Sequence, residues 1–161
     1  MAEVIDLGQA RFYIDEEYYK EFFNQTAKGE THLDREVFEF YCQEFLWAFI
    51  LGIKSGERTK INRKTKYSLF DQDTFKNRSK ILKLITALTL QELYSDDPNK
   101  LKEDFEEATE KGENLGAKIT DAIEEFANTG FSILERRTKN TPGYIENIQA
   151  VIDDILNDEV W

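Results

Sequence analysis

The chain has 161 residues, of which 40% are hydrophobic and 33% charged. That is apolar enough for the packed core of a single domain, so wholesale disorder is excluded, and two prolines and eight glycines argue against a turn-rich β architecture. The single cysteine, Cys42, fits a reducing compartment, and no apolar run approaches the ~20 residues of a membrane span. We therefore expect one cytoplasmic domain over residues 1–161, with no membrane segment.

The net charge of −11 is distributed unevenly along the chain. Residues 1–51 carry −7 and residues 84–161 carry −11, whereas residues 52–83 carry +7. Such a basic stretch is either an anion site, for a phosphate backbone for example, or the internal partner of the acidic helices around it. The candidate anion-binding residues of this basic segment (residues 54–83) are Lys54, Arg58, Lys60, Arg63, Lys64, Lys66, Lys76, Arg78, Lys80 and Lys83.

The first half of the chain predicts two helices around a short extended run. Residues 11–14 are β-prone but too few to found a sheet, and Asp15 is placed as the N-cap of a helix that ends at Gly29. A second helix is predicted from Asp34, and its aromatic-rich part is apolar on more than half of its circumference. Such a helix is usually central in a bundle, and Gly56 marks its end.

The second half predicts a basic connection over residues 57–72, with an extended piece at 66–70, and then helices only. One helix runs from residue 73 or 74 to about 94, and another from the N-cap Asp97 to Gly112, with a thin apolar face that places it outside the bundle.

A further apolar stripe begins at Leu115 and continues past Gly130 to Leu134. A C-terminal helix follows over residues 141–161. The fold class is therefore all-α, a compact bundle of five or six helices. At most a short β-like piece is expected near the N-terminus or in the basic connection.

The sequence offers little for catalysis. His32 is the only histidine, and Cys42 lies inside the aromatic helix, where a small buried side chain is the ordinary explanation. Adjacent carboxylates such as Glu124 and Glu125 point about 100° apart on a helix, so we interpret them as solvated faces rather than as a metal or acid–base site. No glycine-rich phosphate loop is present. We expect no enzyme activity, no metal and no cofactor.

Two short motifs suggest a family. The first ends the aromatic helix in Gly-x-x-x-Gly-x-Arg, and the second reads Glu-Phe-Ala-Asn-x-Gly; their marked positions are Gly52, Gly56, Arg58, Glu125, Asn128 and Gly130. The glycine spacing fits either a tight helix end or a close helix contact, Asn128 suits a bond to a neighbouring loop, and Gly130 suits close backbone packing.

In order and separation these motifs, over a region of residues 10–135, resemble the Dnd system-associated protein 4 family. Dnd systems exchange a non-bridging phosphate oxygen of bacterial DNA for sulphur and restrict unmodified DNA. The resemblance implies an accessory role in DNA modification or anti-phage defence. Together with the charge pattern and the lack of a catalytic motif, it leads us to expect a non-enzymatic module with protein partners and with DNA as a second candidate partner, contacted through the basic segment.

Two alternatives remain open at this point. An acidic inhibitor that imitates DNA agrees with the net charge of −11 but not with the basic segment. A metal-dependent nuclease built on carboxylates has no matching motif.

Overall fold

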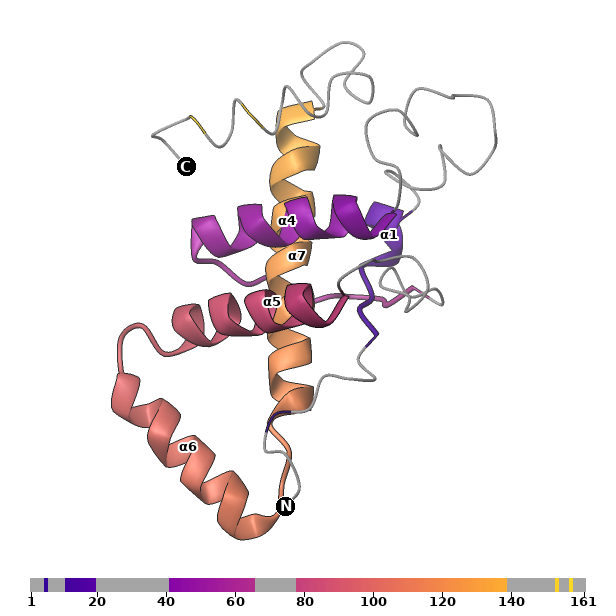
Figure 1. Cartoon of the computed structure of the whole chain (residues 1–161). Coiled ribbons are helices and arrows are strands. Elements are labelled where there is room, and N and C mark those ends of the chain that lie inside the picture. Colours follow the sequence, from indigo (N-terminus) through magenta and orange to yellow (C-terminus); the bar gives the residue numbers. More distant parts are fainter. Residues whose placement is uncertain are drawn as a thin grey trace.

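The computed structural model describes residues 5, 11–19, 41–65, 78–138, 153 and 157. In these residues the protein is helical and contains no strand, which confirms the all-α prediction (Figure 1). The helices are α1 (Glu16–Tyr18), α4 (Tyr41–Ser55), α5 (Arg78–Leu93), α6 (Pro98–Lys111) and α7 (Gly116–Thr138). The expected extended piece at 66–70 and most of the expected C-terminal helix lie outside the described residues.

Helix α7 is the longest helix, and α4 and α5 cross it on the same side (Figure 1). The predicted apolar stripe of α7 is buried almost throughout, and α4 covers its centre, where the Phe49 and Phe126 rings meet edge to face at 6.4 Å. Helix α5 adds Leu82 and Ile85 to the same core. Burial of an aromatic side chain stabilises a fold by about 2–3 kcal/mol. The α4–α7 contact buries such side chains from both helices, so it is the main stabilising contact between the described helices.

Two glycines bring α4 and α7 into backbone contact. A Cβ atom on Gly52 would lie 1.8 Å from the carbonyl oxygen of Phe126, and one on Gly130 would lie 1.7 Å from that of Ala48. The contact is reciprocal, since each helix supplies one glycine and one carbonyl. Gly52 therefore serves close helix packing, whereas Gly56, with φ of +72°, ends α4 in the left-handed conformation that favours glycine.

The helix ends follow the predicted capping. The Asp15 carboxylate accepts a hydrogen bond from the Glu17 amide at 3.2 Å, and Asp97 caps α6 ahead of Pro98. Gly112 ends α6 with φ of +64°. Helix α6 buries only Ala108 and extends away from α4 and α5, as expected for the outer helix (Figure 1).

The only extended pairing among the described residues lies next to the expected β-prone run 11–14 and before the expected piece at 66–70, which is outside the described part. Asp15 and Lys64 form an isolated antiparallel bridge, flanked by the bonds from Thr65 N to Ile14 O (3.0 Å) and from Glu16 N to Arg63 O (2.8 Å). The chain that follows α4 thus returns to the N-terminal segment.

None of the described helices is long and apolar enough to span a membrane.

Candidate functional site

Residues 57–65, here called the connector, run along one face of α7. The Thr59 amide donates to the carbonyl of Glu125 at 3.3 Å, and the hydroxyl groups of Thr59 and Thr129 bond at 2.9 Å. The Asn128 Nδ2 donates to two successive connector carbonyls, those of Thr59 (3.2 Å) and Lys60 (3.3 Å). The path of the connector is therefore fixed mainly by polar groups of α7.

Two arginines of the connector pair with carboxylates that are less exposed than they are. The Arg58 Nη1 lies 3.6 Å from Glu125 Oε2, and the Arg63 Nε lies 2.8 Å from Glu16 Oε2. The Arg63 side chain is 78% exposed, against 30% for Glu16. In both pairs the side chain of the arginine is more exposed to solvent than that of the carboxylate.

Lys64 covers a buried carboxylate. Its Nζ lies 2.9 Å from Glu124 Oε1, while the Tyr13 amide donates to Glu124 Oε2 at 2.7 Å. The Glu124 side chain is 2% exposed, so the expectation that this residue belongs to a solvated face is wrong. Burial raises the pKa of Glu124 despite the opposing contacts from Lys64 and Tyr13, and the bond to Glu124 raises the pKa of Lys64. The carboxylate joins α7, the connector and the N-terminal segment.

The remaining predicted cations are spread over other elements. Lys60, Lys80 and Lys83 are exposed and have no ion pair with another residue of the described ranges, and Lys54 is exposed in the last turn of α4. Lys80 and Lys83 lie on the face of α5 opposite the buried Leu82 and Ile85. Lys66, Lys76 and the side chain of Arg78 lie outside the described part.

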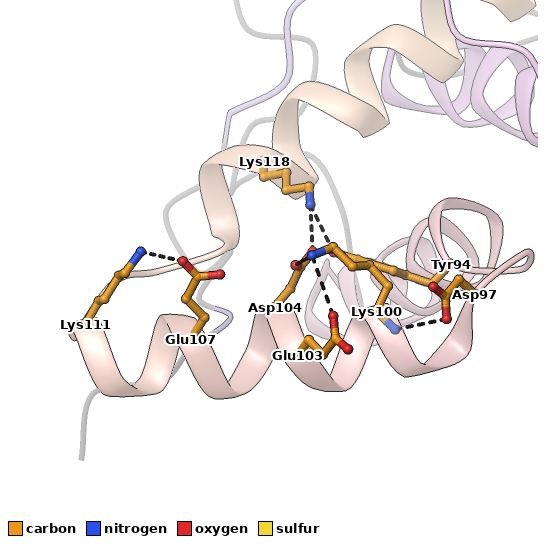
Figure 2. A network of polar contacts seen from close by, with 8 residues as sticks. All are labelled: Tyr94, Asp97, Lys100, Glu103, Asp104, Glu107, Lys111 and Lys118. Carbon is orange, nitrogen blue, oxygen red and sulfur yellow. Dashed lines mark hydrogen bonds and ion pairs between the residues drawn. The ribbon is translucent and has the colours of Figure 1, made fainter.

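The acidic helix α6 is attached to the bundle through one carboxylate (Figure 2). Asp104 Oδ2 accepts from the Tyr94 hydroxyl at 2.7 Å and from Lys118 Nζ at 3.0 Å, and its Oδ1 lies 3.0 Å from Lys100 Nζ. These donors, the Tyr94 hydroxyl first, hold the pKa of Asp104 well below its usual range. The network connects the end of α5, the middle of α6 and the first turn of α7.

Exposed carboxylates on α6 alternate with lysines rather than forming an unbroken acidic surface. Lys100 lies 3.8 Å from Glu103, Lys102 lies 3.7 Å from Glu106, and Lys111 pairs with Glu107. A protein that imitates DNA needs continuous negative charge, and these pairs interrupt it.

In the described part of the chain, no group of three or more histidine, cysteine or acidic side chains is placed to hold a metal ion. His32 and the side chain of Cys42 are outside that part.

Residues 20–159 match the family model described as DNA sulphur modification system-associated protein 4. The chain belongs to this family. The match includes most of the residues from 141 onward, beyond the region of 10–135 on which the resemblance was expected. No curated protein and no solved structure matches the chain.

The motif positions that suggested this family come together in the fold. They form the crossing of α4 with α7, the end of α4 and the attachment of the connector to α7; the six are Gly52, Gly56, Arg58, Glu125, Asn128 and Gly130. The predicted roles of Asn128 and Gly130 are confirmed. The sequence did not identify Thr59, Thr129 and Glu124 as residues that join the connector to α7. The one signal for the two α7 residues was that polar residues interrupt the apolar stripe of that helix.

Proposed function

We propose that this protein is a non-enzymatic accessory module of a DNA sulphur modification system. It acts through contacts with partner proteins of that system, and its connector contacts the phosphate backbone of DNA. The observation that carries the DNA contact is the arrangement of charge in the connector. In its pairs with Glu16, Glu124 and Glu125 the cation is the more exposed partner, whereas the Lys64 Nζ also lies 3.7 Å from Asp121 Oδ1, whose side chain is 65% exposed against 51% for Lys64.

Such an arrangement suits phosphate. Each of these carboxylates contacts the charged end of its cation, and the side chains of Arg58, Lys64 and Arg63 nevertheless remain 43%, 51% and 78% exposed. Lys60 lies between Arg58 and Arg63 in sequence, is exposed and has no ion pair with a described residue. Phosphate recognition needs only charge and reach, so no base-reading element is required.

The net charge sets a limit on this contact. At −11 the whole protein repels DNA at long range, so binding by the isolated chain is weak and falls steeply with salt. Partner proteins would then supply part of the affinity, which agrees with an accessory role.

The test is a titration of the full chain onto labelled duplex DNA, plain and phosphorothioated, at two salt concentrations. The variant pair Lys60→Glu with Arg63→Glu is compared with Lys102→Glu with Lys111→Glu on α6, since both change the net charge from −11 to −15 (−11 − 4). The connector pair should lose about tenfold more affinity and lower the salt slope by about 2. Lys64 is left unchanged because it covers buried Glu124.

Four results would count against parts of the proposal. Equal losses in both variant pairs remove the connector as the site, and no binding at low salt removes the DNA contact. Cleavage of DNA by the purified protein with a divalent metal contradicts the non-enzymatic role. Loss of co-purification with proteins of the modification system in the connector pair alone would assign the same surface to a protein partner instead.

A further inference from the structure

Asn128 is buried in the middle of α7 and is only partly satisfied. Its Nδ2 donates to the carbonyls of Thr59 and Lys60, but its Oδ1 has no hydrogen-bond partner among the described residues. An unpaired buried acceptor costs about 1–3 kcal/mol, and an apolar side chain of the same size would avoid that cost. The two donated bonds are therefore what the asparagine contributes here.

One of these bonds reaches Lys60, which no other contact from α7 binds. Glu125 and Thr129 both bind Thr59, whereas the next backbone contact along the connector is the Asn62 amide, which donates to Asp15 Oδ2 at 2.9 Å. Among the backbone contacts of the described residues, Lys60 is held by Asn128 alone. Its carbonyl faces α7 while its side chain is exposed to solvent.

We propose that Asn128 is a positioning residue for anion binding: by holding the Thr59 and Lys60 carbonyls against α7, it presents the Lys60 ammonium group to the phosphate backbone. This inference rests on the proposed function. It assigns a role to a residue that touches no ligand, and it accounts for a buried acceptor left without a partner.

A double-mutant cycle on the full chain tests the inference. The variants are Asn128→Leu, which removes both the donors and the unpaired acceptor at similar volume, Lys60→Ala, and the two combined. Duplex DNA affinity at low salt and amide hydrogen exchange of residues 59–62 are measured for each. Asn128→Leu should weaken binding about fivefold and speed exchange of the hydrogen-bonded Thr59 and Asn62 amides, and the double variant should bind no more weakly than Lys60→Ala.

The matched control is Thr129→Ala, which removes a bond to Thr59 and touches no other connector residue in the contacts above. It should leave the affinity within twofold of the unaltered protein. If Asn128→Leu does not fold, Asn128→Ser replaces it, because a serine hydroxyl is too short to reach both carbonyls.

Two outcomes overturn the positioning role. If the losses for Asn128→Leu and Lys60→Ala multiply, Asn128 does not act through Lys60. If exchange of the Thr59 and Asn62 amides does not change in Asn128→Leu, the side chain does not hold the connector. The exchange result stands even when the unaltered protein binds no DNA, so failure of the positioning role and failure of the proposed function are distinguishable.

Discussion

The α4–α7 crossing and the attachment of α6 hold this protein together in different ways. At the crossing, Gly52 and Gly130 let two backbones touch, and the surrounding side chains are apolar. At α6, Ala108 is the only buried residue, and Asp104 supplies the polar contact to the rest of the bundle. The first contact depends on shape and the second on charge, so different perturbations should break them.

Two carboxylates show the same difference within the polar contacts. Glu124 is almost fully buried, and loss of hydration raises its pKa although Lys64 and the Tyr13 amide contact it. Asp104 retains some solvent contact and receives bonds from Tyr94 and lysines, which lower its pKa. The balance between burial and donors decides the sign, since both carboxylates face lysine.

The largest effect is expected from Gly130→Ala. The added Cβ would meet the Ala48 carbonyl, so α4 and α7 must separate, at a cost of about 3 kcal/mol or more. Gly112→Ala is the matched control at the end of α6, where no atom lies within 4 Å and only the positive φ costs about 1–2 kcal/mol. Urea unfolding of both variants measures the difference. Equal losses would mean that the crossing is not closely packed.

An intermediate and local effect is expected from Asp104→Asn. The amide cannot pair with Lys100 and Lys118 as the carboxylate does, so α6 should open with a free-energy loss of about 1–2 kcal/mol. Hydrogen exchange should rise in α6 and leave α4 unchanged. Lys102→Ala, which removes only an exposed pair with Glu106, should change α6 by less than about 0.5 kcal/mol. Faster exchange in both helices would contradict a local attachment.

The smallest expected effect is a difference in how the stability of α6 and the stability of the connector respond to pH. The pKa of Asp104 is lowered in the fold, so its stabilising contribution is present above its ordinary value of about 3.9 and is lost as the pH falls below it. The pKa of Glu124 is raised, so its contribution is present below about 4.3 and is lost as the pH rises through the folded value. Acid below about pH 3.9 should therefore loosen α6 while the connector stays protected.

Exchange measured by segment between pH 3 and pH 7 checks this prediction. Asp104→Asn should remove the acid response of α6, and Glu124→Gln should leave it intact. An acid response that begins at the connector would contradict the assignment of the two carboxylates.

Local features of the fold could be predicted because they depend on near neighbours in the chain. Asp15 and Asp97 cap helices, Gly56 and Gly112 end them, and the stripe of α7 is buried, since capping and periodicity involve residues within a turn or two. The motifs were also sufficient to indicate the family, which the match over residues 20–159 shows.

The partners of charged residues could not be predicted in the same way. The basic segment was open to two interpretations, and the fold places Arg58, Arg63 and Lys64 beside carboxylates from distant parts of the chain. Glu124 was assigned to a solvated face because adjacent carboxylates point about 100° apart on a helix, but it is buried by the connector and by residue 13.

The helices of the described part, several of their ends and the uneven charge follow from local sequence patterns. Which glycine packs against a backbone and which cations cover carboxylates depends on how distant segments pack. The physical reason is range: capping and periodicity act within a few residues, whereas the contacts between Gly130 and Ala48 and between Lys64 and Glu124 exist only after segments far apart in sequence have packed together.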